Sequence, residues 1–365
     1  MSPTLSVIVP VLNEVATVAT FLQGLARQER VAFEVILCDG GSTDGTLVAA
    51  DPFKDAFPCG LIMLAGARGR GRQMNAGAAA ARGKWLLFLH ADSKFPDSAA
   101  LRKGLSVLTE AAVINGHGRM AGRFALRFDT SGEMLRFGYY FCEGKARLGR
   151  HGCILGDQGL LLSREFFTVV GPFDESLPVA EDVDLAERIR LCGNVLLLPA
   201  EIITSPRRFE TEGYRARQTL NALLMGLLFA SRHRFLQALP GIYRNQDHNR
   251  PLNLEPFFRE IASMIAKLPM RERLVFWYRI GSYVRSNAWQ LAFILDERRN
   301  YRLGLKAGDG EAPLLARYDR YLDRVTDHPP GRLLTAGLVR GWFSLARRWP
   351  RLREGGTEND KRAGR

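Results

Sequence analysis

EVILCDGGSTDGT, residues 34–46, is an apolar run that ends in a glycine-rich loop. The run from Val35 to Cys38 contains no polar residue, which is typical of a strand buried on both faces of a sheet. Similar runs flank it, with helix-like stretches between them. We expect strands at residues 5–10, 33–38, 61–64 and 84–89 and helices at 15–28, 43–50 and 71–81. This alternation predicts an α/β fold, in which a mostly parallel sheet carries helices on both faces.

The length of the chain and the change in its hydrophobic pattern indicate two structural regions. The chain has 365 residues, of which 46% are hydrophobic and 24% charged, so it is neither mostly disordered nor a disulfide scaffold. After about Tyr214 the strand pattern fades, and apolar residues recur at helical spacing in 217–235, 256–267, 274–298 and 311–324. We therefore expect an α/β domain over residues 1–215, a helical accessory region over 216–353 and a disordered polar tail over 354–365.

The charge of the chain is unevenly distributed. The formal net charge is +13, yet residues 1–205 carry 21 basic and 22 acidic side chains, whereas residues 206–365 carry 30 basic and 16 acidic ones. The basic excess lies in the helical region, where it attracts anions. An anionic membrane surface, a phosphorylated acceptor or a nucleic acid fits this field, and so does a merely solvated, arginine-rich helix surface.

Cysteine content and hydropathy indicate the cellular setting. The five cysteines are odd in number and include no CxxC pair, which favours reduced thiols over a zinc site or a disulfide framework. The longest stretch without a charge, residues 218–231, is 14 positions long, whereas a spanning helix needs about 20. The N-terminus has no pattern of a secretory signal. We expect a cytoplasmic protein, with peripheral docking on the inner face of the membrane as an option.

Polar side chains follow two of the expected strands at their carboxyl ends, where α/β sheets bind ligands. Asp39 ends the second strand and can accept hydrogen bonds from a ribose or a base, or its loop simply caps a turn. Asp92 follows the fourth strand, where a carboxylate suits a divalent cation held together with substrate phosphates, or caps a helix.

Two charged groups carry further chemistry. Glu181 and Asp182 begin a predicted helix, where the dipole favours acids, so they are either a structural helix start or a general base with a neighbour that orients it. Arg68, Arg70 and Arg72 are spaced by glycines ahead of a helix, which is a favourable place for an anion. An RNA-binding segment is the alternative for this arginine run.

Two more segments offer contacts to a substrate. Gly156, Asp157 and Gln158 precede a predicted strand, and they either contact a sugar or acceptor or form a turn. Arg207 and Arg208 follow Thr204-Ser205-Pro206, and they either clamp a diphosphate or acceptor or are a surface pair.

Four motifs follow one another along residues 4–210. They are SVIVPVLNE, EVILCDGGSTDGT, RGRGRQMNAGAAAARGKWLLFLHADS and GDQGLLLSREFF…GPFDESLPVAEDVDLAERIRLCG. Together they resemble a family 2 glycosyltransferase. Within that family the chain is most similar to the bacterial subgroup with RGRGRQMNAG, FLHAD and GDQG motifs that is linked to arsenosugar biosynthesis.

The resemblance implies a GT-A fold, a nucleotide-diphosphate sugar as donor and a divalent metal, Mn²⁺ or Mg²⁺. By position it implies a nucleotide and donor site made of Pro10, Asn13, Glu14, Asp39, Arg68, Arg72, Asn75, His90, Ala91 and Asp92. It implies that Asp92 binds the metal and that Asp182 is the catalytic base beside Glu181. Contacts to the acceptor or the diphosphate would come from Gly156, Asp157, Gln158, Arg207 and Arg208.

His90 departs from the family pattern, because it stands where the family has the first Asp of its Asp-x-Asp motif. Imidazole tolerates Mn²⁺ better than Mg²⁺ as a ligand. It can also hydrogen-bond a ribose or phosphate, or serve as a structural histidine.

The sequence thus predicts an inverting glycosyltransferase of the hexosyltransferase type, which moves a sugar from a UDP-sugar to an acceptor hydroxyl. A sugar nucleotidyltransferase is one alternative, but it would have a Gly-rich, Arg-containing loop where this chain has Pro10-Val-Leu-Asn-Glu14. A non-catalytic nucleic-acid-binding protein is the other. Neither explains residues 90–92 and 181–182 at their spacing, so we expect no nucleic acid partner. The basic helices pack on the catalytic domain, form a homodimer or lie on an anionic membrane.

Overall fold

The computed structural model describes residues 2–130, 136–230, 233–246 and 250–347. The tail over 354–365 lies outside the described residues. The chain divides into two compact units, residues 1–206 and 207–365. The first unit ends at Pro206, two residues after its last strand, whereas the sequence pattern extends the α/β part to residue 215.

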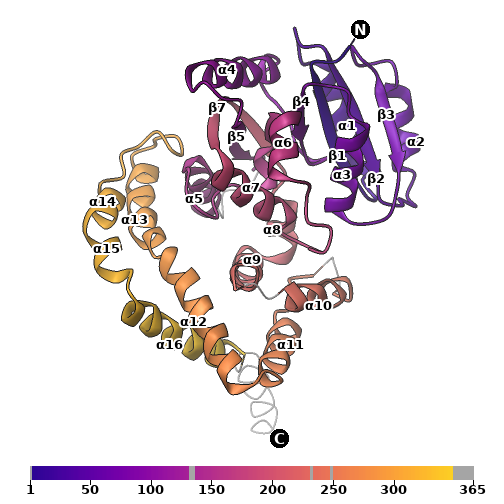
Figure 1. Ribbon diagram of the computed structural model, residues 1–365. Coiled ribbons are helices and arrows are strands. Elements are labelled where there is room, and N and C mark those ends of the chain that lie inside the picture. Colours follow the sequence, from indigo (N-terminus) through magenta and orange to yellow (C-terminus); the bar gives the residue numbers. More distant parts are fainter. Residues whose placement is uncertain (1, 131–135, 231–232, 247–249, 348–365) are drawn as a thin grey trace, which may run out of the picture. The chain divides into compact units, whose positions relative to one another are not determined.

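A seven-stranded sheet forms the centre of the first unit (Figure 1). Its order is β3-β2-β1-β4-β6-β5-β7, and only the pairs β4–β6 and β5–β6 are antiparallel among the pairs described. The strands are β1 (Leu5–Val11), β2 (Phe33–Asp39), β3 (Leu61–Ala65), β4 (Trp85–Phe88), β5 (Met120–Phe128), β6 (Leu160–Ser163) and β7 (Asn194–Thr204). The four predicted strands are therefore confirmed, and so is the mostly parallel sheet.

Helices cover both faces of this sheet, as predicted. The helices are α1 (Val15–Ala26), α2 (Thr46–Ala50), α3 (Arg70–Ala80), α4 (Ala100–Ile114), α5 (Arg136–Arg147), α6 (Arg164–Val170) and α7 (Glu181–Cys192), with short turns η1 (Asp51–Phe53) and η2 (Gly156–Gln158). Helices α3, α6 and α7 share one apolar core with alternate residues of β1, β2, β4 and β6. Helix α4 packs on the opposite face, where its Gly104 lies against Leu161 and Leu198.

The second unit is helical throughout its described residues, which confirms the predicted helical C-terminal region. Its elements are α8 (Arg207–Glu212), α9 (Tyr214–Phe229), α10 (His233–Arg244), α11 (Glu255–Ala266), α12 (Met270–Ser286), α13 (Trp289–Arg302), α14 (Pro313–Arg317), the π-helical turn η3 (Tyr318–Leu322), α15 (Asp323–Thr326) and α16 (Pro329–Ala346). Among the described residues, no helix is both long enough and apolar enough to cross a bilayer.

The apolar stretch at 274–298 is two helices, α12 and α13, rather than one. Asn287 ends α12, because its side chain donates to the carbonyl oxygen of Tyr283 (3.0 Å) and accepts from Gln290 (2.9 Å). These local hydrogen bonds compete with helix continuation. The break makes α12 a separate helix. It packs closely on α16, where Gly281 lies against Ala336.

We predict that Gly77→Ala destabilises the first unit. A β-carbon on Gly77, inside α3, would lie 2.4 Å from Cγ2 of Ile8 and 2.7 Å from Sγ of Cys38, so helix and sheet would have to separate. Overpacking of this kind costs about 1–3 kcal/mol. Chemical denaturation followed by circular dichroism measures the loss in the free energy of unfolding.

Gly24→Ala is the matched control, because Gly24 also lies inside a helix but nothing comes within 4 Å of an added β-carbon. There the change should stabilise the protein by about 0.5–1 kcal/mol, since alanine loses less backbone entropy. Equal effects at the two glycines would contradict the close approach of α3 to the sheet.

Candidate active site

The carboxyl ends of β1, β2 and β4 lie at one edge of the sheet, because these strands are parallel neighbours. β6 runs in the opposite direction beside β4, with Leu160 opposite Phe88. The loop that precedes β6 therefore meets the residues that follow β4. This single antiparallel strand brings Gly156 and Asp157 next to His90.

His90 lies in the wall of a pocket on this edge. The pocket is lined by Met74, Phe88, His90, Ile154, Leu155, Gly156, Leu160, Phe173, Asp182 and Ala186. Nδ1 of His90 is 2.9 Å from Oδ1 of Asp157. Burial and the charge of Arg70 oppose protonation, but the hydrogen bond to Asp157 and the charges of Asp157 and Asp92 outweigh them and raise the pKa of His90.

Asp182 faces the same loop from the start of α7. Its Oδ2 accepts a hydrogen bond of 2.6 Å from the backbone N–H of Gly156, and its Oδ1 accepts one of 2.9 Å from Val183. A β-carbon on Gly156 would lie 2.5 Å from Asp182 Oδ2 and 2.9 Å from His90 Nε2. The absence of a side chain at Gly156 thus allows the carboxylate and the imidazole to approach each other.

Arg70 holds the two acids at the start of α7. Its Nε lies 2.5 Å from Oε1 of Glu181, and its Nη2 lies 3.9 Å from Oδ1 of Asp182. Glu181 is only 1% exposed, and this guanidinium is the ion-pair partner of its buried side chain. Burial disfavours the charged form of Arg70, but the charges of Glu181 and Asp182 outweigh burial and raise the pKa of Arg70.

The backbone before these acids is strained. Ala180 adopts the left-handed region with φ 63°, and it is buried. Only three described non-glycine residues have positive φ, and a second one, Asn13, belongs to the loop after β1. Strain of this kind costs about 1–3 kcal/mol and persists where the surroundings enforce it, which occurs often at functional sites.

The loops after β1 and β2 are locked to each other. The carboxylate of Asp39 accepts from the backbone N–H groups of Gly41 and Ser42 (3.1 Å each) and from the hydroxyl of Ser42 (2.5 Å). Oδ1 of Asn13 accepts from the N–H of Thr43 (3.0 Å). The N–H of Glu14 donates to the hydroxyl of Thr46 (2.8 Å). These contacts make the two loops one rigid rim.

Pro10 and Ala91 are two further residues that are predicted to belong to the nucleotide site. Pro10 is buried within β1 beside Cys38 of β2, and Ala91 is buried between His90 and Asp92. Neither side chain has a polar group, so their contribution to this edge is to shape the backbone.

Asn75, Arg72 and Arg68, which the resemblance places at the nucleotide, lie in different environments. Asn75 accepts from the N–H of Phe173 (2.9 Å) and donates to Phe173 O (3.0 Å) and to Glu175 (2.9 Å), so it holds the loop between α6 and α7. Arg72 is exposed and lies 3.5 Å from Glu175. Arg68 is exposed as well.

Gln158 is not available to a ligand. Its side chain is fully buried, its Oε1 accepts from Arg123 (2.9 Å), and its Nε2 donates to the carbonyl oxygen of Cys153 (2.7 Å). Both ends of the amide are therefore hydrogen-bonded inside the unit, and Oε1 is a partner of the buried Arg123 guanidinium. Gln158 therefore has a structural position, whereas Gly156 lies in the pocket wall and Asp157 lies beside His90.

Asp92 is half-buried beside β7. Its Oδ2 is 3.4 Å from the hydroxyl of Thr204, and no described residue donates to its Oδ1. Within the described residues, no three His, Cys, Asp or Glu side chains gather as metal ligands. One carboxylate at this edge still fits a hard cation that takes its other ligands from substrate phosphates and water.

Arg207 and Arg208 belong to the second unit, where they begin α8 with exposed side chains. The site of the first unit is thus built from α3, α7, the loop after β4 and the loop before β6. It brings together Arg70, His90, Asp157, Glu181 and Asp182.

Arg70 is the residue of this cluster whose position the sequence motif did not predict. Arg68, Arg70 and Arg72 look alike in the motif, but only Arg70 shares a helix face with Gln73, Met74 and Gly77, which are all buried. This spacing of three, four and seven residues marks the inward face. The motif likewise did not predict the inward position of Gln73. Its side chain joins β1 to β2 by donating to Val11 O (2.9 Å) and Cys38 O (2.6 Å).

We predict that Arg70→Met lowers the free energy of unfolding by about 1–3 kcal/mol, because it leaves the buried Glu181 carboxylate without a partner. Arg72→Met is the matched control, since Arg72 and Glu175 are each about half exposed, and such a pair contributes less than about 1 kcal/mol. Urea titrations of both variants measure the difference, and equal losses would contradict the ion pair with Glu181.

The sequence is similar to known glycosyltransferases. The family model described as glycosyl transferase family 2 matches residues 6–167. A PGL/p-HBAD biosynthesis glycosyltransferase of Mycobacterium tuberculosis is 31% identical over 201 residues, which is 54% of this chain and 73% of that protein. An uncharacterized glycosyltransferase of Haemophilus influenzae is 34% identical over 111 residues, 30% of this chain and 36% of that protein.

Among solved structures, the chain is similar to the mannosyltransferase PcManGT from Pyrobaculum calidifontis, solved with GDP-Man and Mn²⁺. The TM-score is 0.48 at 19% identity, over 94% of this chain and 88% of that one. With the family match in sequence and with the predicted fold class confirmed, the conclusion is that the chain belongs to glycosyl transferase family 2.

Proposed function

We propose that this family 2 glycosyltransferase moves a sugar from a UDP-sugar to an acceptor hydroxyl in one inverting displacement, with Asp182 as the general base. The observation that carries the proposal is the position of Asp182. Its carboxylate lies in the pocket wall at the start of α7, 2.6 Å from Gly156 N, within a site that also contains His90 and Arg70. A general base has to reach the proton that it removes, and a pocket wall provides that access.

The two adjacent acids have different tasks in this proposal. Glu181 is buried and bound by Arg70, so it holds the guanidinium in place rather than accepting a proton. Asp182 keeps 16% of its side chain exposed, and Arg70 is farther from it, at 3.9 Å. Removal of the acceptor proton by Asp182 raises the nucleophilicity of the oxygen that attacks the anomeric carbon from the face opposite the nucleotide.

Positive charge in the same cluster would suit the leaving nucleoside diphosphate. His90, whose pKa is raised beside Asp157, and Arg70 lie within the same cluster. A cation near a departing phosphate stabilises the negative charge that develops in the transition state. The exposed Arg68 and Arg72 add to this positive charge.

The nucleotide would bind on the rim made by the loops after β1 and β2. Pro10, Asn13, Glu14 and Asp39 belong to this rim, which the hydrogen bonds between the loops hold in shape before a ligand arrives. Such preorganisation lowers the entropy cost of binding. Asp92 would hold a divalent cation, which as a Lewis acid would neutralise diphosphate charge.

We predict that Asp182→Asn slows sugar transfer by about 10²–10⁴-fold, the usual worth of a general base, while nucleotide affinity is retained. Asp184→Asn is the matched control, because Asp184 lies on the same helical turn but pairs with Arg188 at 2.9 Å. Turnover of a panel of UDP-sugars with the two variants measures the effect. Undiminished transfer by Asp182→Asn would remove this residue from the role of base.

We predict that UDP binds to the purified chain, more tightly with Mn²⁺ than without it, and that Asp92→Asn removes the dependence on metal. Titration calorimetry measures both. Asp55→Asn, at an exposed acid of the same unit, is the control and should change neither value. Binding of GDP but not UDP would overturn the proposed donor, and metal-independent binding would assign diphosphate neutralisation to the arginines and His90 alone.

A further inference from the structure

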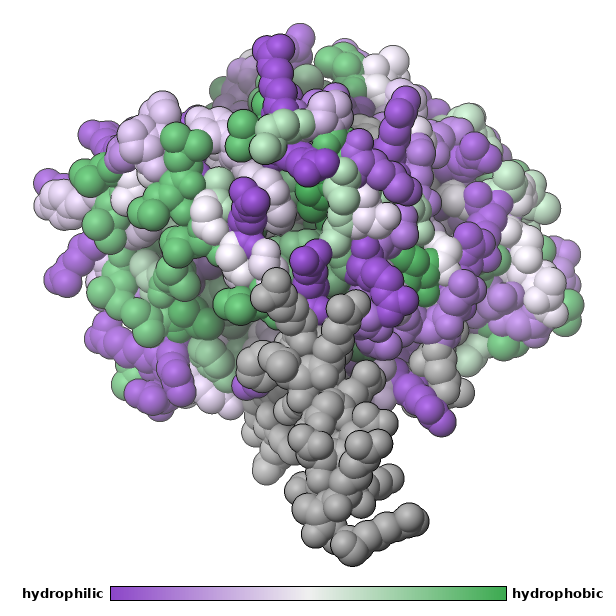
Figure 2. Space-filling model, turned by 90° about the horizontal axis from the view of Figure 1, so that it is seen from below, coloured by the Kyte–Doolittle hydropathy of each residue, from purple (hydrophilic) through white to green (hydrophobic). Residues whose placement is uncertain are grey.

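A guanidinium is buried inside the first unit. Hydrophilic side chains ordinarily stay in contact with water, as those at the surface in Figure 2 do. Arg123 of β5 is instead only 1% exposed, and no fully buried side chain among the described residues is larger. Burial, together with the charges of Arg147 and Arg190, lowers the pKa of Arg123 to about 10. The fold therefore holds a positive charge where its surroundings oppose it.

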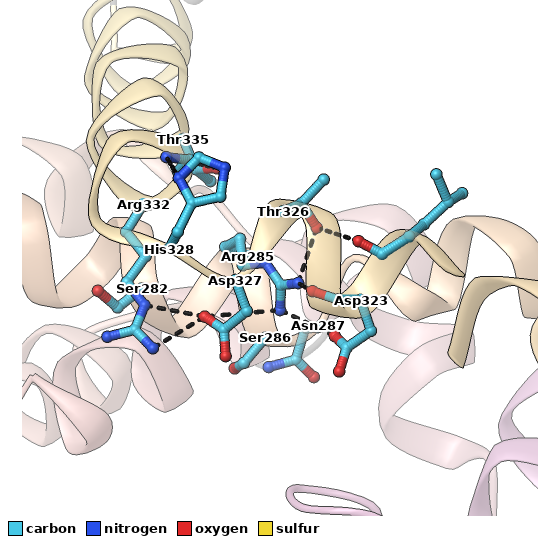
Figure 3. A network of polar contacts seen from close by, with 12 residues as sticks. Ser282, Arg285, Ser286, Asn287, Asp323, Thr326, Asp327, His328, Arg332 and Thr335 are labelled. Atoms are coloured by element: carbon cyan, nitrogen blue, oxygen red, sulfur yellow. Dashed lines mark hydrogen bonds and ion pairs between the residues drawn. The ribbon is translucent and has the colours of Figure 1, made fainter. Parts of the chain in front are cut away.

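The other buried arginine of the described residues has carboxylate partners. Nη1 of Arg285 lies 2.9 Å from Asp323 and 3.8 Å from Asp327 (Figure 3). Arg123 forms no ion pair with any residue in the described part of the chain, and its Nε has no hydrogen-bond partner there. A buried charge without a counter-charge is unfavourable for stability, so the role of Arg123 lies in the contacts that it does make.

Arg123 joins the end of α5 to the turn η2. Its Nη1 donates to the carbonyl oxygen of Ala146 and to Oε1 of Gln158 (2.9 Å), and its Nη2 donates to the carbonyl oxygen of Arg147 (3.2 Å). The two carbonyl groups belong to the last turn of α5, and this end of a helix favours a cation. Gln158 is the last residue of η2. The guanidinium thus fixes η2 to a helix outside the site.

The first two residues of η2 are the ones that meet the site. The backbone N–H of Gly156 donates to Asp182 (2.6 Å), and Oδ1 of Asp157 lies 2.9 Å from Nδ1 of His90. Both residues belong to the same three-residue turn as Gln158, whose side chain is fully buried. A shift of this turn therefore changes both contacts at once.

A substrate would weaken the contacts that hold η2 from the side of the site. In the proposed function, Asp182 accepts a proton from the acceptor and His90 faces a phosphate, so both groups would turn to the substrate. The amide of Gln158 is bound to Arg123 and to the carbonyl oxygen of Cys153 (2.7 Å) inside the unit. These buried contacts can hold η2 in place while the groups of the site change partners.

We propose that Arg123 is a positioning residue that acts through Gln158 to hold the turn η2 in its place in the site. It thereby fixes the contacts that η2 makes with Asp182 and His90. The inference rests on the proposed function, in which Asp182 is the general base. Placement matters there, because a displacement of about 1 Å can cost about 10²-fold in rate. The unfavourable burial of a cation without an acid is then a cost in stability that serves the geometry of the site.

Gln158→Met in the full chain tests the proposal, because methionine has a similar length but no amide group for Arg123 and Cys153. We expect kcat for transfer from a UDP-sugar to fall at least about tenfold, while UDP affinity stays within about threefold, since the rim is built from other loops. We also expect the amide hydrogen of Gly156 to exchange with solvent at least about tenfold faster, which nuclear magnetic resonance measures without any substrate.

Gln28→Met is the matched control. Gln28 is also a buried glutamine with both ends of its amide in use, because its Nε2 donates to Asp97 O (2.8 Å) and its Oε1 accepts from Leu101 N (3.1 Å). These bonds connect the segment after α1 to the start of α4. The control should lower the midpoint of urea unfolding to a similar extent, yet leave kcat and the exchange of the Gly156 amide unchanged.

A second variant, Arg123→Met, tests whether the arginine acts through the glutamine. It should reproduce the changes seen in Gln158→Met. Because both residues act through one contact, the double variant should transfer sugar no more slowly than the slower single variant. Circular dichroism checks that each variant folds.

Three results would overturn the proposal. They are wild-type kcat and amide exchange in Gln158→Met, an equal loss of kcat in Gln28→Met, and losses of kcat that multiply in the double variant. Failure of the proposed function has a different signature, which is that the wild-type chain transfers sugar from none of the UDP-sugars. The exchange of the Gly156 amide then still decides whether Arg123 holds η2, because that measurement needs no transfer.

Discussion

The ion pair between Arg70 and Glu181 is the constraint on which the site depends. A carboxylate that is 1% exposed needs a cation, and Arg70 provides it at 2.5 Å from a helix more than a hundred positions away in sequence. The starts of α3 and α7 must therefore lie together. Asp182 follows Glu181 directly, so the same ion pair determines where its carboxylate lies relative to Gly156 and the pocket.

The direction of one strand completes the cluster. Because β6 runs against β4, the loop before it reaches the edge where the parallel strands end, and Asp157 meets His90. If β6 ran parallel, that loop would lie at the opposite edge. The side chains of the candidate site thus come from the ends of several strands, as is common in α/β folds, while side-chain hydrogen bonds join the loops after β1 and β2.

The two units use apolar residues in different ways. In the first, they fill both faces of a sheet, and few large ones are exposed. In the second, the helices satisfy their own packing and still present a row of leucines on α16. Ion pairs of Arg285 with Asp323 and Asp327 connect α12 to the segment that leads into α16.

Much of the fold was predictable from local pattern. Apolar runs such as Val35–Cys38 marked the strands, helical spacing marked the second unit, and the family's motifs supported membership in glycosyl transferase family 2. The break between α12 and α13 was not predictable from periodicity, because it depends on a few side-chain hydrogen bonds of Asn287. Likewise, the motif did not show that Asn75 and Gln158 would be used inside the unit.

By itself, the sequence determined the first four strands and the helices between them, the uneven charge and the residue types at the strand ends, because these follow from spacing and composition. Only the tertiary structure decided which of three similar arginines meets the acids, that Gly156 admits Asp182 beside His90, and that α16 keeps one apolar side outward. The physical reason is that each of these depends on a partner distant in sequence, and burial, not local preference, selects that partner.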